Sequence, residues 1–175
     1  IGITPDSLLK RAVLMYGLFP RRPPMTALDP LSLYRTRSCS RQWLGFVRAM
    51  AEEFAAELPD ADLALLMARI GERFARAHPL APCATLEAVE QAANQVWDSC
   101  DWGQCTLDEH ADHVLIQHTG APLSVALDGA NWGDGFLQGV YDAWFQHLGM
   151  LAGLTVQRTA GETVDLRRLV LARTA

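Results

Sequence analysis

The sequence DGFLQGVYDAWFQHLG, residues 134–149, decides the fold, because it carries two adjacent rows of apolar residues at helical spacing. Two such rows predict a helix with a wide apolar face. Asp134 is expected to cap the first turn by accepting a backbone N–H, and Gly149 to end the helix in a left-handed conformation. The rows are Phe136, Val140, Trp144 and Leu148, and beside them Leu137, Tyr141 and Phe145.

So wide a face needs a broad partner, either a sheet built from the flanking strands or another subunit. One small sheet is expected to be too narrow to cover both rows, so we expect part of the face to lie at a subunit contact. Replacing Trp144 by alanine should then lower both stability and assembly. The predicted interface residues are Phe136, Val140, Tyr141, Trp144 and Leu148.

Composition excludes several classes of protein. Half of the 175 residues are apolar, which suffices for one sizeable core, and no apolar run is long enough to span a membrane. A net charge of −5 argues against a nucleic-acid binder, because such proteins neutralise phosphates with Lys and Arg. An even set of cysteines raises the question of disulfides, but a domain with a good core has little need of them, so free thiols are expected. These are Cys39, Cys83, Cys100 and Cys105.

Residues 1–24 are expected to be distinct from a main domain at residues 25–175. The chain begins at Ile1, whereas Met25 reads like a natural beginning, and residues 1–24 carry a charge of +3, which leaves −8 for the rest. Residues 5–19 predict a helix, followed by a proline-rich link. Two interpretations remain: an ordinary or added terminal helix, or a partner-derived segment that docks on the domain. Its apolar docking side is Leu8, Leu9, Val13 and Tyr16.

Residues 25–37 predict an arm without regular structure, and three amphipathic helices follow. The first begins after Ser40 and ends before Pro59, the second begins at Asp60 or Asp62 and ends at 78–79, and the third is opened by Thr85. The first two are expected to form an antiparallel pair. The first helix should point Trp43, Val47, Met50, Phe54 and Leu58 inward, and the second Leu63, Leu66, Met67, Ile70 and Phe74.

Short β-rich runs occupy the second half of the chain. Residues 102–107 and 113–118 predict one hairpin, and residues 154–158 and 166–173 a second hairpin across a turn at Gly161. Strands grouped by hairpins and helices in blocks indicate an α+β domain. We therefore predict a helical N-terminal half followed by two antiparallel β-hairpins that flank a long central helix.

Candidate chemistry is sparse. His110 and His113 lie on a predicted hairpin among acidic residues, without the tight spacing of zinc sites, so a solvated turn is the better interpretation. The glycine-rich residues 129–139 lack a phosphate-loop or dinucleotide motif, and the chain has no nucleophile elbow. No catalytic residue, metal site or cofactor is predicted. The other members of the His cluster are Cys100, Cys105, Asp108, Glu109 and Asp112.

Five tryptophans raise the possibility of sugar stacking. Trp43, Trp97 and Trp144 fall on apolar helix faces and are expected in the core. Trp102 and Trp132 each lie beside a glycine at the edge of an element, so they are the two candidates for contact with a glucan chain.

From about Gln42 to Arg173 the chain resembles the BcsD family, the D subunits of bacterial cellulose synthase. The resemblance lies in Trp102-Gly103 before Thr106-Leu107, in residues 114–118, and in Trp132 followed by FLQGVYDAW, where Gln138 replaces an acidic residue. It implies a non-catalytic accessory protein that assembles as dimers into a cylindrical octamer and promotes crystalline cellulose.

The resemblance also implies partners. A periplasmic channel for glucan chains and a cytoplasmic scaffold that aligns synthase complexes are the two pictures of the family. The expected free thiols and the lack of a convincing export signal favour the cytoplasmic scaffold, with a proline-rich or helical protein of the synthase system as partner and possible glucan contact. A small dimeric secretion-chaperone-like module that binds an extended client is the alternative.

Overall fold

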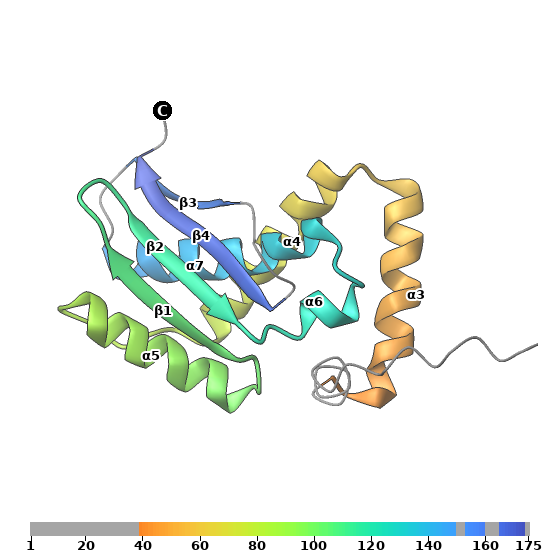
Figure 1. Ribbon diagram of the computed structural model, residues 1–175, viewed down its shortest axis with the longest axis horizontal. Coiled ribbons are helices and arrows are strands. Elements are labelled where there is room, and N and C mark those ends of the chain that lie inside the picture. Colours follow the sequence, from red (N-terminus) through yellow and green to blue (C-terminus); the bar gives the residue numbers. More distant parts are fainter. Residues whose placement is uncertain (1–38, 150–152, 160–164, 174–175) are drawn as a thin grey trace, which may run out of the picture.

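The computed structural model describes residues 39–149, 153–159 and 165–173. It confirms the predicted α+β class, with helices first and then a sheet packed against a long helix (Figure 1). The predicted helix at 5–19, its docking residues and the arm at 25–37 lie outside the described residues. The elements are α3 (Arg41–Glu57), α4 (Asp60–Ala77), α5 (Leu86–Ser99), β1 (Gln104–Glu109), β2 (Val114–Thr119), α6 (Leu123–Ala126), η1 (Asn131–Asp134), α7 (Gly135–His147), β3 (Leu154–Arg158) and β4 (Leu166–Arg173).

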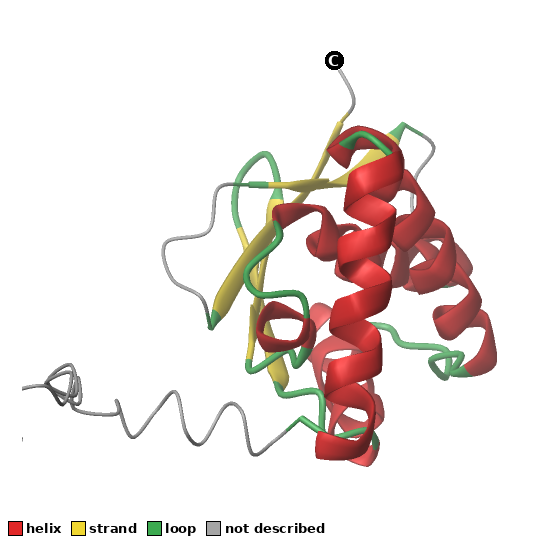
Figure 2. Cartoon of the chain, turned by 90° about the vertical axis from the view of Figure 1, so that its right-hand side faces the viewer, coloured by secondary structure: helices red, strands yellow, loops and turns green. Residues whose placement is uncertain are grey.

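The two predicted hairpins join into one antiparallel sheet with the order β1-β2-β4-β3. The last described strand, β4, therefore lies in the interior of the sheet, between β2 and β3. Helices gather on one side of the sheet (Figure 2). Alternate residues of the strands, among them Ile116, Val156 and Leu169, are buried on that side, as expected for an antiparallel sheet with one covered face.

Helix α7 is the centre of the core, and α4 covers the side that the sheet leaves open. The two helices approach closely through glycines: a Cβ built on Gly71 of α4 would lie 2.1 Å from the carbonyl oxygen of Phe136. Reciprocally, a Cβ on Gly135 would lie 2.3 Å from the oxygen of Ala64, and one on Gly139 would lie 2.0 Å from the oxygen of Ala68. Backbone contact of this kind requires glycine on both helices. The expectation that a sheet alone is too narrow was correct, but α4 completes the cover.

A buried hydrogen-bond chain crosses the core from α5 to the sheet. Nε2 of His118 lies 2.8 Å from the carbonyl oxygen of Trp102, which only accepts, so Nε2 carries the proton. Nδ1 therefore accepts from the Tyr141 hydroxyl at 2.7 Å, and that hydroxyl oxygen accepts from Nε1 of Trp97 at 3.2 Å. Each of the four groups in this hydrogen-bond chain has a partner while His118 is neutral. Burial lowers the pKa of His118 from 6.5 to about 4.

Side chains from helices cap both edges of the sheet. Asn94 of α5 accepts from the N–H of Cys105 at 2.7 Å and donates to its carbonyl at 2.9 Å, so it pairs with β1 as a neighbouring strand would. On the opposite edge, Gln138 of α7 donates to the carbonyl of Val156 at 2.9 Å, and Asp142 accepts from its N–H at 3.1 Å. Occupied edge groups are not available for pairing with another chain.

Helix boundaries agree with the sequence, but several local predictions were wrong. Thr85 accepts from the N–H of Ala88 as predicted, and Gly149 adopts a left-handed φ of +86°. Ser40 makes no side-chain cap, and Asp134 does not cap α7, because its carboxylate instead pairs with Arg167 at 2.7 Å. The region before α7, for which the sequence predicted no helix, contains the short helices α6 and η1.

The predicted antiparallel pair of α3 and α4 is also wrong. Helix α4 packs most extensively on α7, and α3 contacts α4 and α6 only slightly. Figure 1 shows α3 at one end of the molecule, away from the sheet. Ile70 of α4, predicted to point inward, is exposed, and so is Leu65 of the same helix.

Candidate interaction surface

Helix α3 presents a continuous apolar stripe to solvent. Of its seventeen residues, Ala51 is the one that is buried. The stripe residues follow one another at intervals of three or four, which places them on one face of the helix. Trp43 and Phe46 are the most exposed, at 59% and 61%, and their rings meet edge to face at 6.2 Å. The α3 stripe consists of Trp43, Phe46, Met50, Phe54 and Leu58.

The opposite flank of α3 attaches it to the rest of the protein. The Arg48 guanidinium donates to the carbonyl of Val125 at 3.2 Å, and the Cys39 thiol before the helix donates to the carbonyl of Pro122 at 3.6 Å. Ala51 packs with Leu127 and Trp132 in a small second core. The attachment is therefore narrow and runs mainly through α6, which explains why the stripe stays uncovered by the described residues.

The charges of α3 oppose the dipole of their own helix. Arg41 and Arg48 lie in its N-terminal half, while Glu52, Glu53 and Glu57 lie in its C-terminal half. Its first turn has no acidic residue and its last turn no basic one. Cations at a helix N-terminus and anions at its C-terminus are unfavourable by a few tenths of a kcal/mol each, roughly. Arg41 and Glu57, which lie in the terminal turns, are therefore slightly unfavourable for the helix.

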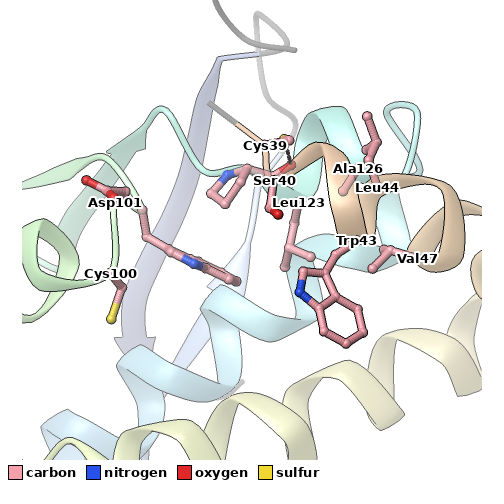
Figure 3. Close-up of a pocket in the computed structure, with 11 residues that line it drawn as sticks. Cys39, Ser40, Trp43, Leu44, Val47, Cys100, Asp101, Leu123 and Ala126 are labelled. Atoms are coloured by element: carbon pink, nitrogen blue, oxygen red, sulfur yellow. Dashed lines mark hydrogen bonds between the residues drawn. The ribbon is translucent and has the colours of Figure 1, made fainter. Parts of the chain in front are cut away.

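A cavity of about 500 Å³ lies beside the start of the α3 stripe (Figure 3). Trp43 and Leu123 line one side, and Cys100 and Asp101 the other. Trp102 also lines it and is half-buried, because its ring packs against Phe136 with centroids 4.8 Å apart. The cavity is bordered by apolar side chains and two thiols.

Most of the predicted interface residues of the central helix α7 are buried in the core of their own chain. Phe136, Val140, Tyr141 and Trp144 are all buried, and Nε1 of Trp144 donates to the carbonyl of His78 at 2.9 Å. Of the five, Leu148 alone keeps partial exposure. A subunit contact through these side chains remains a prediction, but it has little exposed surface to rest on.

The two candidate glucan-binding tryptophans differ. Trp132 is buried in the second core with Leu63 and Leu127, which leaves it no face for a sugar ring, whereas Trp102 borders the cavity. The structure does not bring the two rings to one surface, since they belong to different clusters. We predicted an exposed ring for Trp132 because it lies beside a glycine at the edge of an element. The short helix η1 instead buries this side chain.

His110 and His113 stack at the tip of the β1–β2 hairpin, with ring centroids 4.5 Å apart. The Nδ1 of His113 contacts the exposed Asp112 carboxylate at 2.7 Å, which lowers the pKa of Asp112. Within the described residues, no group of three His, Cys, Asp or Glu side chains is arranged to hold a metal ion. All four cysteines are free thiols, and burial raises the pKa of Cys105 to about 11, so that thiol is unreactive at neutral pH.

The sequence analysis placed four of the five stripe residues, all except Phe46, on an apolar face but assigned that face to the core. The apolar spacing alone gave no signal of whether the partner of this face lies in the same chain. None of the described helices has both the length and the apolar character of a membrane-spanning helix.

A family model for the D subunit of cellulose synthase matches residues 30–172. No curated protein matches the chain. Among solved structures, trafficking protein particle complex subunit 3 from Naegleria fowleri, covalently bound to palmitic acid, is similar with a TM-score of 0.51. The sequence identity is 8%, and the match covers 81% of this chain and 97% of that chain. At this identity the similarity describes the fold.

Proposed function

Because the chain belongs to the cellulose synthase D-subunit family, whose members are non-catalytic accessory proteins of bacterial cellulose synthesis, we propose that it is an oligomeric scaffold. In this role it organises synthase complexes so that their glucan chains form ordered cellulose. The α3 stripe is the observation that carries the proposal. An exposed apolar patch typically marks a protein–protein contact, and here four large apolar side chains on one face of α3 are followed directly by Leu58.

The occupied edges of the sheet favour assembly through a helix over assembly through strand addition. Strand addition is a common route of self-association, but Asn94, Gln138 and Asp142 already occupy backbone groups of both edge strands. The stripe is therefore the more favourable surface for assembly. We propose dimers as the unit, and an octamer built from such dimers as the scaffold.

The proposed location is the cytoplasm, with the periplasm as the alternative. The four free thiols fit a reducing compartment. The proposed partners are a proline-rich or helical protein of the synthase system and, through Trp102 at the cavity, glucan chains.

Light scattering on the full chain tests the proposal. A dimer that grows toward about eight chains with concentration supports a scaffold, whereas a monomer at tens of micromolar contradicts it. A particle that stops at a dimer and binds extended client peptides would instead support the secretion-chaperone-like alternative. In cells that lack the native subunit, the chain should restore crystalline cellulose, measured by diffraction.

A further inference from the structure

We propose that the α3 stripe and the cavity at its start form the docking surface for the N-terminal segment of this protein, residues 5–19. The segment precedes the first described residue, Cys39, and lies outside the family match, which begins at residue 30. The inference names the occupant of the stripe. It rests on the proposed function in one respect: assembly through the stripe requires that the segment dock on a neighbouring copy.

The path of the chain brings this segment to the stripe. Cys39 and Ser40 line the cavity together with Trp43, the first residue of the stripe, so the described domain begins at one end of the proposed surface (Figure 3). Residues 20–38, which join the segment to Cys39, reach at most about 63 Å at about 3.3 Å per residue. Helix α3 is only about 25 Å long at a rise of about 1.5 Å per residue. The segment can therefore reach every part of the stripe.

Attachment to the same chain favours this segment over a separate partner. A short flexible link holds a tethered group at a local concentration on the order of millimolar. A free protein at micromolar concentration would need to bind roughly a thousandfold more tightly to compete for the same surface. Even a weak contact is therefore enough for the tethered segment to occupy the stripe.

The segment and the stripe both carry apolar faces that water does not favour. Residues 5–19 predict a helix with an apolar docking side, and a helix this short is marginal in water unless that side is buried. On the domain, Trp43 and Phe46 are the most exposed residues of the stripe. Packing the docking side on the stripe removes both apolar faces from water.

The charges beside the stripe are opposite in sign to those of residues 1–24, which carry +3. Glu53 and Glu57 are exposed, and each follows a stripe residue, Phe46 or Met50, by seven positions. Seven positions at about 100° each bring a helix back to within about 20°, so both carboxylates border the stripe itself. Residues 52–62 contain five acidic residues and no Lys or Arg. A basic segment is thus attracted to this end of the stripe, and salt should weaken the attraction.

Photo-cross-linking in the full chain tests the docking. Benzoylphenylalanine in place of Phe54 keeps an aromatic ring on the stripe and bonds to whatever lies against it. Ala56 is the matched control position, because it is also exposed and a turn of about 100° per residue places it on nearly the opposite face of α3. We expect the probe at residue 54 to cross-link to residues 5–19, identified by mass spectrometry, and the probe at residue 56 not to.

Cross-links from residue 54 to another α3, or to any part of the protein other than residues 5–19, would overturn the inference. Equal cross-linking of the segment from both positions would also overturn it. Mixing chains of natural and heavy-isotope composition shows which copy supplies the segment. Cross-links between copies support both the docking and assembly through the stripe, whereas cross-links within one chain support the docking and contradict assembly through the stripe.

A matched pair of substitutions within the segment provides an independent measurement. Val13 belongs to the docking side, whereas Ser7 belongs to the opposite side of the predicted helix. Val13→Asp should lower the cross-link yield from residue 54 at least about fivefold, because it places a charge in an apolar contact. Ser7→Asp adds the same charge outside the contact and should leave the yield unchanged. Equal losses in the two variants, with unchanged circular dichroism, would refute the docking side.

Discussion

Helices α7 and α3 look alike in sequence, since both carry a wide apolar face, yet in the structure α7 is mostly buried and α3 is mostly exposed. Helix α7 lies between the sheet and α4, and eight of its thirteen residues are buried, whereas α3 buries Ala51. Glycines at the α4–α7 crossing allow backbone contact, and α3 has no such crossing with α4. An apolar face therefore predicts a helix that needs a partner, but it does not say whether the partner is in the same chain.

Trp144→Ala is expected to have the largest effect. The side chain is 2% exposed, and truncating a buried tryptophan costs about 3–5 kcal/mol. Urea unfolding should show this loss, while Phe46→Ala on α3 should stay within about 0.5 kcal/mol. Assembly of Trp144→Ala should fall only with the folded fraction. A change in stability under about 1 kcal/mol would show that α7 is no more buried in solution than α3.

Acid should destabilise the core around α7 through His118. Above pH 6.5 the ring is neutral in both folded and unfolded chains, so its full contribution is present. Between pH 6.5 and 4, His118 binds a proton in the unfolded chain but stays neutral in the folded chain, because burial lowers its pKa to about 4. The free energy of unfolding should fall by about 3 kcal/mol across this window.

The matched control for the pH effect is His118→Asn, whose amide can donate to the Trp102 carbonyl and accept from Tyr141. It should reduce the slope of stability against pH in this window. An unchanged slope in His118→Asn would assign the acid sensitivity to other groups.

Two glycine substitutions should act in opposite directions. Gly139→Ala places a methyl group against the backbone oxygen of Ala68, and such overpacking costs about 1–3 kcal/mol. Gly45→Ala on α3 meets nothing within 4 Å, so it should stabilise by about 0.5–1 kcal/mol through helix propensity. Thermal unfolding measures both. Destabilisation by Gly45→Ala would mean that this side of α3 is covered in the assembled protein.

The smallest effect is expected at the hairpin tip. His110→Ala and His113→Ala should leave stability within about 0.5 kcal/mol and cellulose output unchanged, because both rings lie on a turn at the protein surface. Loss of output from folded, assembled His110→Ala would instead indicate chemistry at this turn. Cys105→Ala differs, since its side chain is buried in the core and its removal leaves a small cavity.

The sequence predicted the parts of the structure that local chemistry controls. Spacing and breakers such as Pro59 placed the long helices, and β3 and β4 appear with the predicted bounds. Interactions between distant residues were not predictable in the same way. The Asp134–Arg167 ion pair replaces the expected cap, and the α4–α7 glycine contact and the capped sheet edges depend on tertiary neighbours. The α3 stripe was recognised as apolar, but burial is a property of the whole fold.

The interior position of β4 has a consequence for how the protein is made. β1 and β2 can form a hairpin as soon as they leave the ribosome, but the sheet stays divided until residues 166–173 have been synthesised and enter between β2 and β3. Long-range insertion of this kind slows folding and leaves the flanks of β2 and β3 open meanwhile. During that interval the nascent chain is most exposed to mispairing with its neighbours, so folding yield should depend on chaperones and on the rate of synthesis.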